Sequence, residues 1–214
     1  MSCDVVVAVR GGPDAKSRLA SRLTADQREA LVAAMLADML DVLAVCPSVD
    51  RVYVATPTPA LARIAARAGA VVVLEHRSGD LNGAFERARR RIAASEPEAT
   101  VMLLPGDLPR LDAAEVEACL AAAGDGRLVL APASADGGTG ALVLRADAPL
   151  SLAFGVGSFD KHLAAAQDLD LSAEVVRAPG LGFDLDRPAD IDALVAQPGG
   201  GRTVTLLQGW RAAA

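Results

Sequence analysis

A short basic segment near the N-terminus could bind a phosphate chain. Lys16 and Arg18 follow Gly11 and Gly12, and Arg10 precedes them. Glycines let backbone N–H groups approach an anion closely, and the cations can neutralise phosphate oxygens through charge-assisted hydrogen bonds. The segment has neither the spacing of a Walker loop nor that of the dinucleotide-binding G-x-G-x-x-G motif. We therefore interpret it as a cradle for a triphosphate, with a solvated basic turn as the alternative.

Three aspartates could bind a metal ion. Asp107 follows an apolar run, and Asp184 and Asp186 lie two positions apart, so that an extended backbone would point both carboxylates to the same side. Neighbouring anions repel each other unless a cation joins them, and Mg²⁺ accepts such oxygens together with water and phosphate. The sequence therefore predicts a magnesium site on these three side chains. The alternative for Asp186 is that it only caps a helix beginning near Pro188.

Two glycine-rich segments, 136–140 and 154–158, lie farther along the chain. Ser158 has the residue type of a helix N-cap, and the free N–H groups of a helix N-terminus can bind a carboxylate or a phosphate. His162 falls inside the same expected helix, and we predict that it is a partly exposed helix residue. A histidine-rich metal site is not available, because the only other histidine of the sequence is His76.

An alternation of strands and helices would position these residues. Short apolar runs with polar flanks are typical of strands buried in a parallel sheet, and amphipathic segments separate several of them. The pattern predicts an α/β fold with a mainly parallel sheet, in which ligands gather at the carboxyl ends of the strands. The expected strands are 5–9, 51–55, 71–74, 101–104, 128–131 and 141–144, and the expected helices begin at a Thr24–Gln27 capping box and cover 61–68, 83–94 and 112–123.

The length of the chain fits one domain. With 214 residues, 52% hydrophobic and 22% charged, the chain can bury a sizeable core. We assign residues 1–197 to this domain and 198–214 to a glycine-rich break and a C-terminal tail. Leu206, Leu207 and Trp210 of the tail could pack on the domain or on a partner.

Charge and composition argue against several classes of protein. A net charge of -6 and a pI near 4.9 do not fit a nucleic-acid surface, which would be broadly basic. The longest apolar stretch, 31–46, is interrupted by Asp38 and Asp41 and is too short to span a membrane. The N-terminus does not have the pattern of a signal peptide. Three cysteines, distant in sequence and odd in number, suit a reducing compartment, so we expect a cytoplasmic protein.

Several short motifs occur along the chain in order. They are A-K-S-R-L at 15–19, L-N at 81–82, G-D-L-P at 106–109, G-G-T at 137–139, F-G-x-x-S at 154–158 and D-x-D-x-P at 184–188. Each is short, but the ordered set resembles the CofC/FbiD family, the guanylyltransferases of deazaflavin coenzyme F-420 biosynthesis. The resemblance covers about residues 5–194.

The resemblance implies a Rossmann-like nucleotidyltransferase of the glycosyltransferase-A type. Members transfer GMP from GTP to 2-phospho-L-lactate, phosphoenolpyruvate or 3-phospho-D-glycerate and release pyrophosphate. Two departures from the family pattern are Arg10, where lysine is usual, and Gly140, where asparagine is frequent; the sequence does not choose among the acids. The site residues that we assign on this basis are Asp107, Asp184 and Asp186 for Mg²⁺, Gly11, Gly12, Lys16, Asn82 and Asp107 for the nucleotide, and Thr139, Gly140, Gly155 and Ser158 for the phosphoacid.

The expected mechanism is in-line attack by the phosphate of the acid on the α-phosphorus of GTP. A phosphate is ionised at neutral pH, so no general base is needed, and Lys16, Arg18 and Arg10 are the expected catalytic residues because they would stabilise charge on the leaving pyrophosphate. The alternatives are a molybdopterin-type or sugar-1-phosphate nucleotidyltransferase and a non-catalytic nucleotide-binding module. A homodimer and hand-over of the product to the next enzyme of the pathway stay open.

Overall fold

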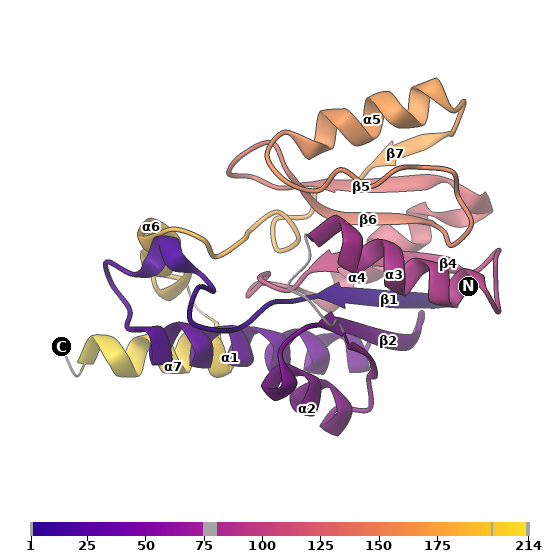
Figure 1. Ribbon diagram of the computed structural model, residues 1–214. Helices are drawn as coiled ribbons and strands as arrows, with labels where there is room; N and C mark the ends of the chain where they lie inside the picture. Colours follow the sequence, from indigo (N-terminus) through magenta and orange to yellow (C-terminus); the bar gives the residue numbers. More distant parts are fainter. Residues whose placement is uncertain (1, 75–80, 198, 213–214) are drawn as a thin grey trace.

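One seven-stranded sheet forms the centre of the protein, in the strand order β3-β2-β1-β4-β6-β5-β7 (Figure 1). The computed structural model describes residues 2–74, 81–197 and 199–212. The predicted α/β class is confirmed, and each expected strand is present. The strands are β1 (Cys3–Ala8), β2 (Val49–Thr56), β3 (Val71–Leu74), β4 (Thr100–Pro105), β5 (Leu128–Pro132), β6 (Thr139–Arg145) and β7 (Ala173–Val175).

Strand β6 runs against the direction of the other strands. It is antiparallel to both of its neighbours, β4 and β5, whereas β1–β2, β1–β4, β2–β3 and β5–β7 are parallel pairs. In the β4–β6 register Leu103 lies opposite Leu142. The start of β6, at Thr139, therefore lies at the same edge of the sheet as the end of β4, from which the chain continues to Asp107.

Helices cover both faces of the sheet (Figure 1). Along β1, Val5 and Val7 pack in one apolar cluster and Val6 and Ala8 in a second, as alternate side chains of a strand must. The first cluster also takes residues of α1, α2, α4, α6 and α7, and the second takes residues of α3 and α5. The helices are α1 (Ala25–Ala44), α2 (Pro59–Arg67), α3 (Leu81–Ala93), α4 (Ala113–Ala122), α5 (Ser158–Asp168), α6 (Pro188–Val195) and α7 (Arg202–Ala212), with short 3-10 turns at Ser17–Leu19 and Gly124–Gly126.

The starts of the helices test the capping predictions. Thr24 caps α1 and forms the expected capping box with Gln27. The prediction that Ser158 is an N-cap is wrong: Gly157 is the N-cap of α5, because that position needs a φ of 66°, which glycine adopts without strain. Ser158 is instead the first helical residue and is fully buried.

The C-terminal tail packs on the domain. Its helix α7 lies along α1 and contributes Val204 and Leu207 to the apolar core. Both carboxylate oxygens of Asp38, on α1, accept hydrogen bonds from the first N–H groups of α7: Oδ1 from Arg202 N–H and Oδ2 from Thr203 N–H, each at 2.9 Å. Asp38 thus has a structural role, because it satisfies the first N–H groups of α7.

The structure also bears on the cysteines and on the absence of a membrane-spanning segment that we expected from the composition. Cys3, Cys46 and Cys119 are free and buried, and all three belong to the apolar core. Burial raises the pKa of Cys3 and of Cys119 to about 12, so both thiols stay protonated at neutral pH. Within the described part of the chain, no helix is both long and apolar enough to cross a membrane.

Candidate active site

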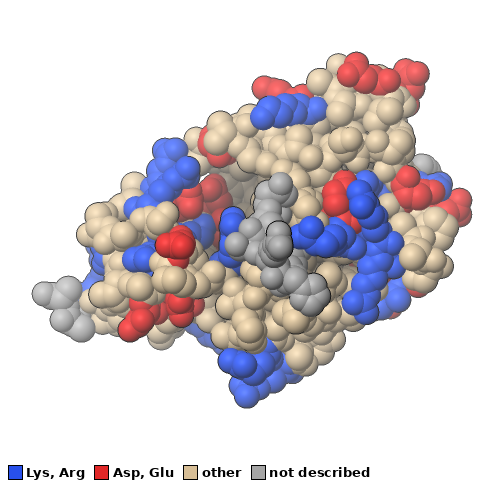
Figure 2. All heavy atoms as spheres, in the orientation of Figure 1, with Lys and Arg blue, Asp and Glu red and all other residues tan. Residues whose placement is uncertain are grey.

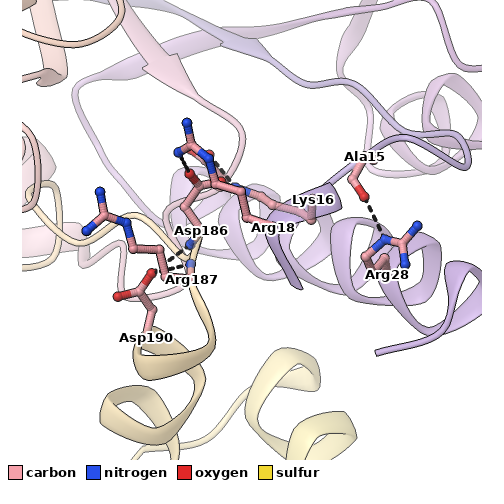
Figure 3. A network of polar contacts seen from close by, with 8 residues as sticks. Ala15, Lys16, Arg18, Arg28, Asp186, Arg187 and Asp190 are labelled. Carbon is pink, nitrogen blue, oxygen red and sulfur yellow. Dashed lines mark hydrogen bonds and ion pairs between the residues drawn. The ribbon is translucent and has the colours of Figure 1, made fainter. Parts of the chain in front are cut away.

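The basic segment after β1 is a loop held in place by an arginine of α1. Arg28 donates from Nε to the carbonyl oxygen of Ala15 at 3.0 Å (Figure 3). It also donates from Nη1 to the carbonyl oxygen of Leu23 at 3.0 Å and from Nη2 to that of Pro13 at 2.6 Å. Lys16 follows in the left-handed region, with a φ of 51°. This conformation is uncommon for a residue with a Cβ and is found where the surroundings enforce it. The loop is therefore built to aim the Lys16 side chain.

Lys16 points at two of the predicted site aspartates. Its ammonium lies 2.6 Å from Asp107 Oδ2 and 3.4 Å from Asp186 Oδ1, and Arg18 Nη1 contacts Asp186 Oδ2. Burial alone would lower the pKa of Lys16, but the two carboxylates outweigh it and raise that pKa. Burial alone would raise the pKa of Asp186, but Lys16 and then Arg18 hold it below its usual value. The structure therefore brings the basic loop and the acidic residues into one ionised cluster.

Asp107 and Asp184 leave two oxygens without a partner. Asp107 Oδ1 and Asp184 Oδ1 are buried and accept no hydrogen bond from the described residues. Burial, and then the negative charge of Asp107, raises the pKa of Asp184. A buried carboxylate oxygen without a donor is costly, and a hard cation is a partner that would satisfy it. This pair of oxygens fits a divalent ion.

The three aspartates are not arranged as a complete set of metal ligands. Among the described residues, no three His, Cys, Asp or Glu side chains are arranged as a metal-ligand set. The Lys16 ammonium pairs with Asp107 and with Asp186 and neutralises charge on both. The magnesium site on Asp107, Asp184 and Asp186 therefore stays a prediction.

Backbone hydrogen bonds hold the two aspartate segments together. Gly106 N–H donates to Ala8 O at 2.9 Å, and Leu185 N–H donates to Asp107 O at 3.1 Å. Glycine is required at position 106, since a Cβ there would lie 2.5 Å from the Cβ of Val9. The ends of β1 and β4 are thus tied to the segment that carries Asp184 and Asp186.

Asp186 does not cap helix α6. The N-cap is Arg187, and the carboxylate of Asp190 accepts the backbone N–H groups of Asp186 at 2.9 Å and of Arg187 at 2.6 Å (Figure 3). The Asp186 side chain points away from the helix start, toward Lys16 and Arg18. The capping alternative for Asp186 is therefore wrong.

A cavity of about 650 Å³ opens at the end of β1, beside this cluster. Its volume lies in the range of ligand pockets. Figure 2 shows basic and acidic side chains adjoining one another to the left of the centre of this face. One predicted donor in the cavity is already used, because Gly11 N–H donates to Thr58 Oγ1 at 3.0 Å. The residues that line it include Arg10, Gly11, Gly12, Lys16, Pro57, Thr58, Leu81, Ala84, Gly106, Asp107 and Asp186.

The predicted acid-binding residues also come together. Ser158 Oγ lies 3.1 Å from Thr139 Oγ1, and Gly157 N–H and Phe159 N–H donate to the carbonyls of Asp136 and Gly137. These contacts bind the 154–158 segment to the 136–139 segment. Gly155 has a φ of +132°, which requires glycine.

Gly140 has a packing role. A Cβ at this position would lie 1.8 Å from Leu181 O, so the side chain must be absent for β6 to pass the loop that leads to Asp184. Glu115 fixes the same loop by accepting the N–H groups of Gly180 and Leu181, each at 3.0 Å.

Asn82 and His162 hold the start of the acid-binding segment. Asn82 Oδ1 accepts Phe154 N–H at 2.7 Å and Asn82 Nδ2 donates to Phe154 O at 3.1 Å, so the amide predicted to bind the nucleotide pairs with backbone. The prediction that His162 is partly exposed is wrong: it is fully buried and contacts Ala153 N and Thr139 Oγ1. Sequence patterns did not single out Arg28 or Glu115 as residues that hold the site. Both have backbone groups of loops as partners, 5 to 15 residues away along the chain for Arg28 and 65 or 66 residues away for Glu115.

The fold is that of nucleotidyltransferases. A protein from Desulfovibrio desulfuricans G20 superposes with a TM-score of 0.80 at 18% identity, covering 99% of this chain and 96% of that one. The 4-diphosphocytidyl-2C-methyl-D-erythritol synthase from Anaerococcus prevotii superposes with a TM-score of 0.60 at 11% identity, covering 97% and 98%. At these identities the similarity shows the fold alone.

The sequence comparisons define the family. The family model "Guanylyl transferase CofC like" matches residues 3–211. The 3-phospho-D-glycerate guanylyltransferase of Phenylobacterium zucineum is 46% identical, with 98% of this chain and 99% of that protein covered. The phosphoenolpyruvate guanylyltransferase of Sphaerobacter thermophilus is 38% identical (91% and 93% covered), and the 2-phospho-L-lactate guanylyltransferase of Methanothermobacter thermautotrophicus is 34% identical (91% and 85%). The chain belongs to the CofC-like guanylyl transferase family and is a nucleotidyltransferase.

Proposed function

We propose that this enzyme transfers GMP from GTP to the phosphate of a small phosphorylated carboxylic acid, releases pyrophosphate and serves the biosynthesis of coenzyme F-420. The observation that carries the proposal is the ionised cluster of Lys16, Arg18, Asp107 and Asp186 at the mouth of the cavity. Cations beside carboxylates at the carboxyl ends of strands are what a triphosphate with a divalent ion requires.

The reaction needs positioning and charge stabilisation. A phosphate oxygen of the acid forms a bond to the α-phosphorus of GTP, and the bond from that phosphorus to the bridging oxygen breaks, so that the electron pair leaves with pyrophosphate. Lys16, Arg18 and Arg10 would stabilise the charge that grows on the leaving group. The only described histidine, His162, is buried, and its pKa is lowered to about 4, mainly by burial, so it does not act as the acid or base.

Magnesium is part of the proposal. Asp107 and Asp184 would hold it through the two oxygens that lack a donor, with Asp186 as the third carboxylate. The ion would supply Lewis-acid stabilisation of the phosphate oxygens. Replacing Asp184 by Asn should raise the magnesium concentration needed for half-maximal rate, whereas an unchanged magnesium titration would contradict the assignment.

The acceptor is proposed to be 3-phospho-D-glycerate. The support is the relative of that name, which is 46% identical over nearly the full length of both chains. Phosphoenolpyruvate and 2-phospho-L-lactate, after which the relatives at 38% and 34% identity are named, are the alternatives. Cytoplasmic location, a homodimer and hand-over of the product stay predictions.

The test is pyrophosphate release from GTP and Mg²⁺ with each of the three acids in turn. We expect release with at least one of them and none with a sugar 1-phosphate. Replacing Lys16 by Met should lower kcat/KM on the order of 10²-fold, because a preorganised donor to the developing charge is lost.

Asp186→Asn should reduce the rate at least as strongly. Asp192→Asn is the matched control, since Asp192 also pairs with two arginines, Arg22 and Arg211, but outside the cavity lining. Normal turnover of Asp186→Asn with magnesium would contradict the proposed site.

A further inference from the structure

The buried His162 has both ring nitrogens in use. Ala153 N–H donates to Nε2 at 2.9 Å, so Nε2 must carry a lone pair. Nδ1 lies 3.0 Å from Thr139 Oγ1. A neutral imidazole has one N–H and one lone pair, and with Nε2 accepting, the proton must be on Nδ1. His162 is therefore a donor to the Thr139 hydroxyl.

This donation fixes how the two neighbouring hydroxyls share their protons. Ser158 Oγ–H donates to Thr139 Oγ1, and His162 Nδ1 contacts the same oxygen. With His162 donating as well, both acceptor positions of Thr139 Oγ1 are filled. The hydroxyl proton of Thr139 itself then has no partner within the cluster. The cluster presents one unused donor.

That donor lies at the functional edge of the sheet. Ser158 and His162 are 0% exposed and Thr139 is 5% exposed, so Thr139 is the least buried member of the cluster. Thr139 begins β6 beside the end of β4 that leads into Asp107. The Thr139 hydroxyl therefore belongs to the same edge of the sheet as the segment that carries Asp107.

We propose that His162 is a positioning residue that holds the Thr139 hydroxyl as a hydrogen-bond donor to the carboxylate of the phosphoacid. The inference rests on the proposed function and adds a residue to its acceptor site. His162 does not touch the acid itself. It acts through Thr139, and through Ala153 it also fixes the backbone that leads into the 154–158 segment.

Two substitutions separate the two contacts of His162. In His162→Asn, the amide nitrogen can take the place of Nδ1 and donate to Thr139, but the Ala153 N–H loses its acceptor. In His162→Gln, the longer side chain can place its oxygen near Nε2 and accept Ala153 N–H, but the donor to Thr139 is lost. We expect His162→Gln to raise KM for 3-phospho-D-glycerate about tenfold, the effect of one hydrogen bond to a charged group. KM for GTP and kcat should change little.

His162→Asn should stay near the wild-type KM. If His162 only supported the backbone at Ala153, the Asn variant would be the impaired one and the Gln variant normal. In a Thr139→Val background, His162→Gln should cause no additional rise in KM for the acid. An additional tenfold rise there would overturn the inference.

Nitrogen NMR of the folded wild-type protein tests the arrangement without turnover or substitution. We expect His162 to show the Nδ1–H tautomer between pH 6 and 8, and its Nδ1 proton resonance to shift on addition of 3-phospho-D-glycerate. The Nε2–H tautomer, or no response to any of the three acids in a protein that does turn one over, would overturn the inference. Absence of pyrophosphate release from all three acids would instead overturn the proposed function, and a shift of the His162 signal would then still support this acid site.

Discussion

Arg28 holds the basic loop through the backbone, since three of its nitrogens donate to the carbonyl oxygens of Pro13, Ala15 and Leu23. Replacing Arg28 by Gln removes donors from these carbonyls, and the loop that carries Lys16 should lose its fixed position. We expect KM for GTP to rise about tenfold or more and the free energy of unfolding to fall by about 1–3 kcal/mol.

Steady-state kinetics and urea unfolding measure these two effects. Arg67→Gln, an exposed arginine at the end of α2, is the control and should change neither. A normal KM for GTP in Arg28→Gln would mean that the loop is held without Arg28.

His162 makes the stability of the protein depend on pH. The folded protein holds its pKa at about 4, below the ordinary 6.5, mainly because the ring is buried and secondarily because Lys161 is close. The unfolded chain takes up this proton near 6.5, so lowering the pH from 6.5 to 4 favours unfolding. The contribution is roughly 3 kcal/mol, at about 1.4 kcal/mol for each pH unit between the two pKa values.

Urea unfolding at pH 7 and at pH 4 measures this loss of stability. The wild type should lose more stability between these values than His162→Gln, since the carboxylates that also titrate there are common to both. Equal losses would show that His162 is not held neutral.

At the residue scale, the sequence is sufficient to recognise groups of functional side chains that lie close together along the chain. The alternate positions of Asp184 and Asp186, and the run of cations at 10–18, could be recognised without a structure. The burial of His162 could not, because its partners Thr139 and Ala153, 23 and 9 residues away along the chain, reach it only when the chain folds back. The pairing of Asn82 with Phe154 is equally invisible in the sequence, and the assignment of Asn82 to the nucleotide stays a prediction.

At the scale of elements, β6 passes close to the loop before Asp184, and from this contact we predict the effect of adding a side chain at Gly140. Gly140→Ala should destabilise the protein by about 2 kcal/mol or more, because its Cβ would lie 1.8 Å from Leu181 O. Gly209→Ala on α7 is the matched control, since no atom lies within 4 Å of a Cβ there. It should stabilise by about 0.5–1 kcal/mol, the usual gain of alanine over glycine in a helix. Thermal unfolding of both variants checks the signs.

The strands were predictable as elements but not in their direction. Apolar runs mark β1 to β6, and in β1, β4, β5 and β6 they are buried, because both faces of such strands must be apolar. The antiparallel course of β6 is set by its tertiary neighbours β4 and β5, and nothing in its own residues records it. The sequence pattern does not predict β7 (Ala173–Val175), because this strand is short and lacks a buried apolar run.

At the scale of the whole molecule, the tail is fastened by Asp38. Asp38→Ala removes the acceptor of the first N–H groups of α7 and should cost about 1–2 kcal/mol. Trp210 is the single tryptophan of the chain and packs against the core from α7, so its fluorescence reports on this helix. We expect its emission to shift to the red at lower urea than in the wild type.

Asp41→Ala is the control for this change. Asp41 lies on the same helix but contacts the exposed side chain of Arg202, so its loss should matter little. Coincident fluorescence transitions in the wild type and in Asp38→Ala would contradict the role of Asp38.

Because β6 runs antiparallel to β4, its first residue, Thr139, lies at the edge of the sheet where β4 ends, so one stretch of chain brings the proposed acid-binding residues to that edge. Thr139, Gly155, Ser158 and His162 all lie in one continuous stretch of chain, while the basic loop and Asp107, Asp184 and Asp186 lie outside it. Under the proposed function, the residues that select the acceptor acid would therefore lie in one continuous segment. That segment can change or recombine in evolution while the residues that bind GTP stay the same. Relatives of one fold that are named for three different acids are what such a modular arrangement would produce in evolution.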